Sequence, residues 1–407
     1  MADKENLASW RVLLAAGMGN FLDGYDLTIV GVVMIVLKPL WHLSPEGLSL
    51  LGGSAVAGSL CGAPLGGFIS DRFGRKSIFL LDIVGFVGGA LLCGLASGIW
   101  MLALFRFILG LAIGADYPLS STYLAECAPA ETRGRFMSLS LGFWMAGAIV
   151  SALVGFVLLG LGPYSWRWMF VSGAIPGVIV LALRAKLPES PLWKKVKSTS
   201  RLQSPWKDPN RGGSIRLWAF VCLPRFCLDL TGYALHIYLP LLLLGLGLRD
   251  THASVFGNAA FLSIFVFGWA INLIFIDRIG RLRLQIVGFF GDAIGLGIVG
   301  FAALSGQPSM AVTVVGLVLY QIANFAGPGI TSWMLPVEVF PTELRGAAQG
   351  ISTAFAHAGG VLVAIILPLS VHHFGVGRTL LLLSVAALVG ALLSIFLGVE
   401  TAKVRLD

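Results

Sequence analysis

The amino-acid sequence predicts an all-α integral membrane protein with twelve transmembrane helices, arranged as two related bundles of six. Three observations lead to this fold class. Only 12% of the 407 residues are charged and 57% are hydrophobic, whereas a soluble domain is usually about 25% charged. Long apolar runs recur along the chain without alternating at every second residue, which argues against transmembrane β-strands. Two sequence motifs also occur once in each half of the chain.

The apolar runs are long enough to cross a bilayer as helices, since a spanning helix needs about 20 apolar residues. We expect helices at residues 9–37, 46–70, 77–97, 99–127, 136–162 and 166–186, and again at 216–246, 252–276, 285–305, 309–336, 347–369 and 378–399. A polar stretch rich in Lys, Arg, Ser and Pro separates the two sets. The sequence therefore predicts an N-terminal bundle at 1–186, a cytoplasmic central loop at 187–215 and a C-terminal bundle at 216–407.

The distribution of Lys and Arg predicts the orientation, because cytoplasmic loops carry an excess of both residues. Of the 28 Lys and Arg residues, 22 fall on one side of the expected spans, including Arg184 at the end of the sixth span, and four fall on the other. We therefore expect both termini in the cytoplasm and the protein in the plasma membrane. Topology accounts for the net charge of +8, so we expect no nucleic-acid partner.

Two motifs repeat between the halves at nearly the same offset. The segment 71–75, Asp-Arg-Phe-Gly-Arg, recurs as Asp-Arg-Ile-Gly-Arg at 277–281, and the segment 126–134 recurs at 338–346 with five of nine positions identical. Both pairs fall in equivalent loops. Parallel repeats are related by an axis along the membrane normal, and they place a substrate site between the halves near the bilayer midplane.

These segments also carry a resemblance to a known family. Residues 67–76 resemble the signature between helices 2 and 3 of the major facilitator superfamily, and residues 106–114 resemble its helix 4 signature. Residues 188–193, Pro-Glu-Ser-Pro-Leu-Trp, resemble the sugar-porter branch. Within that branch, the segment 114–120 and the pair Asp229 and Tyr233 are similar to the phosphate:proton symporters. That family has Gln in helix 5 and Trp in helix 7, where this chain has Trp144 and Arg225.

Charged residues within the spans predict proton coupling, because an ionisable side chain inside a bilayer is costly and faces the bundle interior with a partner. Asp23 and Asp26 lie three residues apart and share one face of the first helix. The family pattern implies that Asp26 pairs with Arg106 and releases it on protonation. We expect Gly110 and Gly114 to let the first helix approach the fourth. The candidate proton-coupling residues are Asp26, Asp23, Arg106 and Asp116.

A polar stripe on the seventh expected helix predicts the wall of the substrate path. Arg225, Asp229, Tyr233 and His236 follow one another at spacings of four, four and three, which places them on one helix face. We expect Arg225 to pair with Asp229 in the empty protein and to take an anionic group of the substrate. The candidate substrate-binding residues are Tyr117, Trp144, Arg225, Asp229, Tyr233 and Asn324, with His236, Gln321 and Trp333 as further wall residues.

The repeated loop motifs predict a latch between the cytoplasmic ends of the two halves. Their charges suit contacts between loops, and their glycines permit tight turns. The candidate gating residues are Asp71, Arg72, Gly74, Arg75, Glu126, Arg133, Asp277, Arg281, Glu338 and Arg345.

The sequence shows no motif of an enzyme or of an ATP-driven pump. It has no HExxH, GxSxG or GxxxxGK[ST] segment, and its five cysteines have no metal-binding spacing. We therefore expect a secondary transporter that is not an enzyme and needs no metal or cofactor. We expect a proton-coupled symporter of a small anion, such as inorganic phosphate or an organic acid, that works as a monomer in the lipid bilayer. A transporter of a sugar or another neutral metabolite, of the sugar-porter type, is the alternative.

Overall fold

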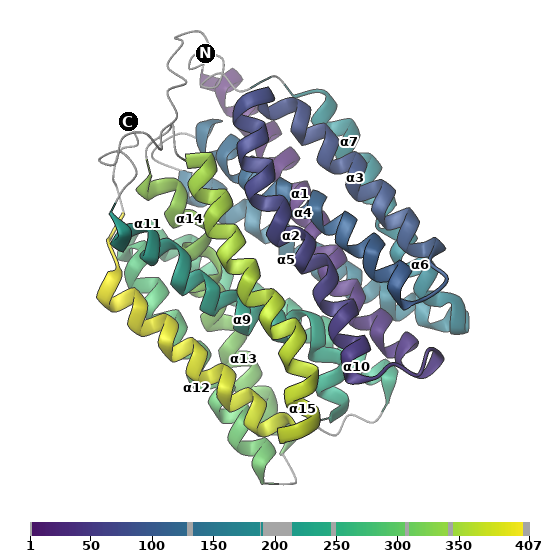
Figure 1. The fold of residues 1–407 in the computed structure, drawn as a ribbon. Coiled ribbons are helices and arrows are strands. Elements are labelled where there is room, and N and C mark those ends of the chain that lie inside the picture. Colours follow the sequence, from purple (N-terminus) through teal and green to yellow (C-terminus); the bar gives the residue numbers. More distant parts are fainter. Residues whose placement is uncertain are drawn as a thin grey trace.

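The computed structural model describes residues 2–127, 133–187, 189, 214–245, 250–305, 309–340 and 345–401, and every regular element within them is helical (Figure 1). The first half contains α1 (Ala2–Leu40), α2 (Pro45–Phe73), α3 (Arg75–Leu95), α4 (Ile99–Cys127), α5 (Arg133–Leu158), the 3-10 helix η1 (Leu159–Tyr164), α6 (Ser165–Ser172) and α7 (Ala174–Ala185). The second half contains α9 (Ile215–Gly245), α10 (Thr251–Ser263), α11 (Phe265–Ile279), α12 (Arg281–Leu304), α13 (Met310–Ala326), α14 (Pro328–Val339) and α15 (Arg345–Leu397).

Ten stretches of the described residues are long and apolar enough to cross a bilayer, and two of these are about twice the length of one crossing. Arg135–Ala185 has 51 residues and Gly346–Leu397 has 52, whereas a single span takes about 20. In each, the chain turns at a glycine with positive φ, Gly162 (76°) or Gly375 (80°). Counting each long stretch as two crossings gives twelve, which confirms the predicted fold class.

The expected helix bounds agree with the structure to within a few residues, and the fourth helix has the expected bounds of 99–127. Four differences stand out. The sixth expected helix is divided into α6 and α7 at Gly173, and the eighth into α10 and α11 at Ile264. The tenth is divided into α13 and α14 at Gly327, where φ is −127° and ψ is −107°. Residues 370–374, expected to connect two helices, continue the helix up to Gly375.

Glycines bring α2 and α4 into contact along their backbones. A Cβ atom at Gly110 or Gly114 would collide with main-chain atoms of α2, and one at Gly58 would collide with main-chain atoms of α4. The expectation that Gly110 and Gly114 admit the first helix was therefore wrong. Helix α1 packs closely against α5 instead, where Gly24 faces the main-chain oxygen of Trp144.

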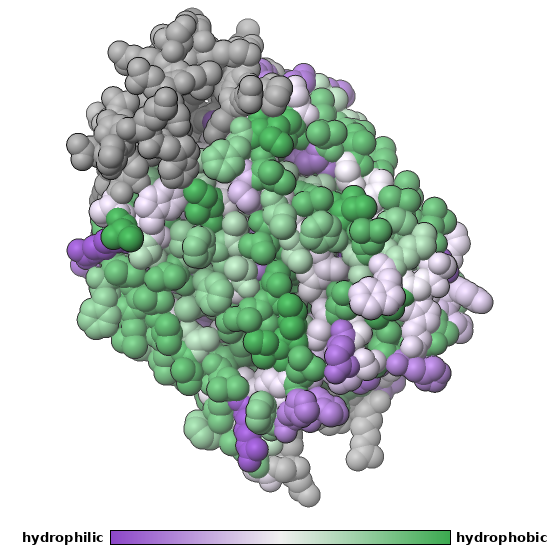
Figure 2. Space-filling view, in the orientation of Figure 1, coloured by the Kyte–Doolittle hydropathy of each residue, from purple (hydrophilic) through white to green (hydrophobic). Residues whose placement is uncertain are grey.

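The surface matches a protein surrounded by lipid. Many large apolar side chains are exposed, among them Leu81, Trp100 and Phe396. Figure 2 shows a broad apolar band across one face, with hydrophilic residues gathered toward its margins. Because lipid tails are apolar, this band needs no polar cover.

The two halves meet through α2 and α15, α1 and α9, and α5 with α10 and α11. Helices α2 and α5 of the first half thus face α15, α10 and α11 of the second. The site described next lies between the two halves. Most of the expected central loop, residues 187–215, lies outside the described residues, so the predicted domain boundaries stay a prediction.

Candidate substrate cavity and proton-coupling residues

A cavity of about 100 Å³ lies between the two halves. The N-terminal half contributes Tyr117 from α4 and Leu141 and Trp144 from α5. Helix α9 contributes Arg225 and Asp229, and α13, α14 and α15 complete the wall. The position between two related halves is the place where parallel repeats put a substrate.

The structure brings all six predicted substrate-binding residues to this cavity. The four stripe residues of α9, spaced four, four and three apart, face it together, as a helical period requires. Asn324 lines it from α13 and Trp333 from α14. Gln321 is fully buried but is not part of the cavity wall. The role of these residues in binding stays a prediction.

The expected pairing of Arg225 with Asp229 was wrong. The Arg225 guanidinium donates a hydrogen bond to Oγ of Ser352 (3.3 Å), and Oδ2 of Asp229 lies 3.2 Å from Nδ1 of His357. The hydroxyl of Tyr233 lies 3.1 Å from the same nitrogen. Both alternative partners come from α15, and spacing along α9 gives no information about that helix. Among the described residues, Arg225 has no carboxylate within ion-pair distance.

Two further polar side chains of the wall are held by neighbours. Nε1 of Trp144 donates to the hydroxyl of Tyr117 at 3.2 Å. The amide nitrogen of Asn324 donates to Oδ2 of Asp292 at 2.9 Å. Asn324 therefore faces the cavity with its amide nitrogen already engaged by a fully buried carboxyl of α12.

The pair implied by the family resemblance is present in the N-terminal half. Arg106 of α4 and Asp26 of α1 lie 3.4 Å apart, and both side chains are buried. Nε of Arg106 also donates to the main-chain oxygen of Leu51 at 3.3 Å. A change in the charge of Asp26 would therefore alter the contacts of Arg106 that join α1, α2 and α4.

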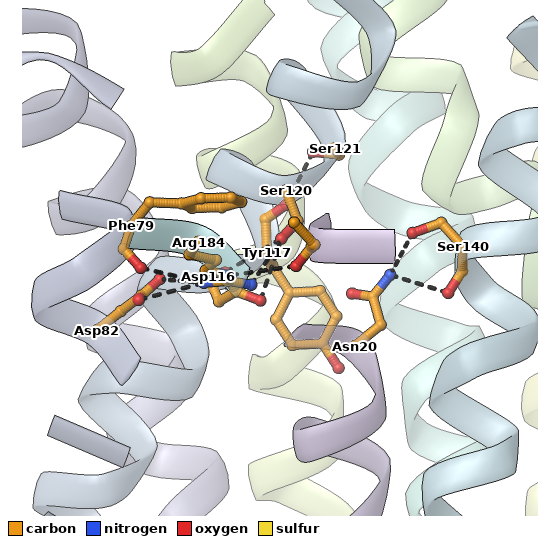
Figure 3. A network of polar contacts seen from close by, with 10 residues as sticks. Asn20, Phe79, Asp82, Asp116, Tyr117, Ser120, Ser121, Ser140 and Arg184 are labelled. Atoms are coloured by element: carbon orange, nitrogen blue, oxygen red, sulfur yellow. Dashed lines mark hydrogen bonds and ion pairs between the residues drawn. The ribbon is translucent and has the colours of Figure 1, made fainter. Parts of the chain in front are cut away.

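A second buried cluster surrounds Arg184, which is 1% exposed (Figure 3). Its NH1 lies 2.7 Å from Asp116 of α4 and 3.2 Å from Asp82 of α3. The expectation that Arg184 lies on the cytoplasmic surface was wrong, because these two carboxyls offset the cost of burying its charge. Asp23 completes the cluster: it lines a void of about 10 Å³ with Asp82 and Asp116, and its Oδ2 is buried with no hydrogen-bond partner in the described part of the chain.

The C-terminal copy of the repeated motif forms an ionic contact. Arg281 lies 2.9 Å from Asp277 and 3.1 Å from Glu338. Asp277 also lies 3.9 Å from Arg135 of α5, so it joins the C-terminal half to the N-terminal half. Gly74 and Gly280 hold the same positive φ of 103° in the two copies. Five predicted gating residues have side chains outside the described part of the structure: Asp71, Arg72, Glu126, Arg133 and Arg345.

A helix cap is also repeated in the two halves. Oε1 of Glu189 accepts a hydrogen bond from the main-chain nitrogen of Arg75 at 3.0 Å. Oε1 of Glu400 accepts one from the main-chain nitrogen of Arg281 at 2.9 Å. A carboxylate satisfies the free N–H groups at a helix start. Glu189 follows the six helices of the first half and caps α3, and Glu400 follows those of the second half and caps α12.

Comparisons with known proteins agree with this architecture. Residues 16–364 match the model of the Major Facilitator Superfamily. The chain is 30% identical to YaaU of Escherichia coli (strain K12), named as a metabolite transport protein, over 97% of this chain and 93% of that protein. It is 26% identical to inorganic phosphate transporter 1-1 of Arabidopsis thaliana, over 89% of this chain and 84% of that protein.

The fold is similar to that of a solved membrane transporter. The proton:xylose symporter XylE bound to 6-bromo-6-deoxy-D-glucose matches with a TM-score of 0.86 and 23% sequence identity. The match covers 98% of this chain and 97% of that chain.

Proposed function

Because the chain belongs to the major facilitator superfamily and is a membrane transporter, we propose that it carries a small anion, inorganic phosphate or an organic acid, together with protons. The two six-helix halves would move about the central cavity, exposing it to each side of the membrane in turn. We place the transporter in the plasma membrane with both termini in the cytoplasm, working as a monomer. The similarity to a phosphate transporter and the Lys and Arg distribution support these assignments.

The observation that carries the anion assignment is the position of Arg225. Arg225 is 4% exposed and lines the cavity, and the described hydrogen-bond partner of its guanidinium is a serine hydroxyl rather than a carboxylate. Asp229 acts on Arg225 from beyond ion-pair distance, so the buried charge is only partly offset, and an incompletely compensated buried charge is costly. An anionic substrate would supply the remaining counter-charge, and a neutral one would not.

Proton coupling is assigned to the carboxyls buried in the N-terminal half. Protonation of Asp26 would remove the counter-charge of Arg106, and the return of the charge would restore the 3.4 Å contact. Because the pair ties α1 to α4, a proton on Asp26 is able to change how these helices pack. Asp23 and Asp116 belong to the neighbouring cluster, and we assign them a supporting role in proton transfer.

The test is uptake into liposomes that contain the purified protein, under an inward proton gradient. We expect labelled phosphate or a small carboxylate to accumulate, and an uncoupler to abolish the accumulation. Asp26→Asn should lose accumulation and the rise of uptake with external acidity, because the variant cannot release or take up this proton. Glu46→Gln, which changes an exposed carboxylate, is the matched control and should behave as the unmodified protein.

The alternative of a sugar or another neutral metabolite is decided by the same experiment. Hexose uptake that ignores the proton gradient, with no anion uptake, would reject both the substrate class and the coupling proposed here. The transporter fold and the central cavity would be unaffected by that outcome.

A further inference from the structure

We propose that the substrate is a small carboxylate carried on a single flat aromatic ring, rather than inorganic phosphate. This inference rests on the proposed function, since it names the kind of anion that the cavity binds. It is carried by the ring side chains of the cavity wall, by the single guanidinium among them and by the cavity volume.

Ring side chains dominate the cavity wall and come from both halves. Seven of the fourteen lining residues carry a ring. Trp144 of α5 meets His236 of α9 edge to face, with ring centroids 5.0 Å apart, and Tyr117 of α4 meets His357 of α15 in the same way at 5.2 Å. Aromatic rings prefer such edge-to-face or offset contacts with other rings. A flat ring between these walls would contact both halves of the transporter.

The polar end of the substrate is defined by Arg225. It is the only Lys or Arg side chain in the described cavity wall, and the carboxylate of the wall, Asp229, is already in contact with His357. A planar guanidinium binds a carboxylate through two parallel hydrogen bonds. One carboxylate would therefore match the one guanidinium of the described wall, which has no carboxylate within ion-pair distance.

Inorganic phosphate has no group that matches the apolar part of this wall. Each of its four oxygens accepts hydrogen bonds, and an acceptor moved from water to an apolar surface without a donor is penalised. Leu141, Leu228 and Phe325 face the cavity and offer no donor. A substrate with a charged end and an apolar body avoids this penalty.

The volume limits the body to one ring. An engineered protein cavity of about 150 Å³ binds benzene, and the cavity here is smaller, about 100 Å³, so a single ring already needs a small separation of the halves. A fused pair of rings would require a larger opening between the halves. Nε1 of Trp333 and Nε2 of His236 are buried without a hydrogen-bond partner among the described residues, so the wall also offers nitrogens to a polar ring substituent.

The test is equilibrium binding to the purified protein in detergent, which avoids passive leakage of organic acids through lipid. We would measure benzoate, cyclohexanecarboxylate, benzamide and inorganic phosphate by titration calorimetry. Benzoate should bind about 10-fold more tightly than cyclohexanecarboxylate, which has the same charge without aromatic character. Benzamide, the neutral counterpart, and phosphate should bind at least 10-fold more weakly than benzoate.

Variants separate ring contacts from general damage. Trp144→Leu and Trp333→Leu should each weaken benzoate binding several-fold and reduce its preference over cyclohexanecarboxylate. Trp333→Phe keeps a ring and should retain that preference. Trp100→Leu, which changes an exposed tryptophan of α4 far along the helix from Tyr117, is the control and should leave binding unchanged.

The possible failures are distinguishable. Phosphate binding with proton-driven phosphate uptake, and no benzoate binding, would overturn this inference and leave the anion symporter intact. Equal binding of benzoate and cyclohexanecarboxylate would overturn the aromatic requirement. Binding of a hexose with no anion bound would overturn both the inference and the proposed function.

Discussion

At the scale of single residues, the numbers of buried carboxyls and guanidiniums in the N-terminal half differ between its two clusters. Arg184 is in contact with Asp82 and Asp116, and Asp23 adjoins the same void, so three carboxyls accompany one guanidinium. Arg106 and Asp26 form a separate one-to-one pair. The larger cluster therefore depends on its single cation for much of its stability.

Arg184→Met should destabilise the protein strongly, because it leaves Asp82 and Asp116 without their counter-charge. Breaking a buried ion pair by removing one partner costs about 3–5 kcal/mol. Thermal unfolding in detergent measures the effect, and Arg184→Met combined with Asp116→Asn should recover part of it. Lys186→Met, an exposed change two residues away, is the control; equal losses in both single variants would contradict the argument.

Sequence reasoning identified the cavity residues better than their partners. The stripe on α9 was predictable, because a helical period is visible in one segment. His357 and Arg184 were missed as partners, since their contacts join helices more than 60 residues apart in the chain. An intramembrane histidine or arginine was the available signal, but no spacing rule indicates which carboxyl it meets.

At the scale of elements, two glycines set where the longest helical stretches turn. Gly162 and Gly375 have positive φ, and nothing lies within 4 Å of a Cβ built at either position. The constraint at these positions is therefore the backbone conformation itself and not the surrounding space. The sequence located the spans on both sides and predicted a helix up to Gly162, but it ended the eleventh span at residue 369, before the turn at Gly375.

Gly375→Ala should destabilise the protein by about 1–2 kcal/mol, because a residue with a Cβ is strained at positive φ. Gly88→Ala is the matched control: its Cβ also meets nothing within 4 Å, but it lies inside α3 without positive φ. Alanine there should be neutral or stabilising by up to about 1 kcal/mol. Unfolding temperatures that shift in the same direction for both variants would reject the explanation.

At the scale of the whole molecule, the halves are joined near the repeated loop motif by an exposed ionic contact. Arg135 of α5 and Asp277 of α11 lie 3.9 Å apart, and Asp277 also contacts Arg281 within its own half. Exposed ion pairs contribute about 0–1 kcal/mol. That is enough to change the ratio of two conformations several-fold without changing the fold.

Arg135→Gln should shift the transporter toward the state in which this side is open. The measurement is the rate at which a single cysteine introduced at Leu141, in the cavity wall, reacts with a charged thiol reagent. A several-fold faster reaction is expected, and Asp277→Asn should act in the same direction. The double variant Arg135→Gln with Asp277→Asn should react no faster than the faster single variant, because either change alone already removes the contact; an unchanged rate in both single variants would show that this contact does not hold the gate.

The two glycine turns also determine what the protein presents to its surroundings. Gly162 and Gly375 occupy equivalent places in the two halves. The first lies in a six-residue 3-10 helix, Leu159–Tyr164, and the second interrupts the helical stretch of α15, so both connections are short. Proteases and most antibodies need a peptide segment that projects from the surface, and these short turns offer them little of one. An epitope tag inserted after Gly162 would therefore create an antibody-binding site there and would report whether the turn tolerates added length.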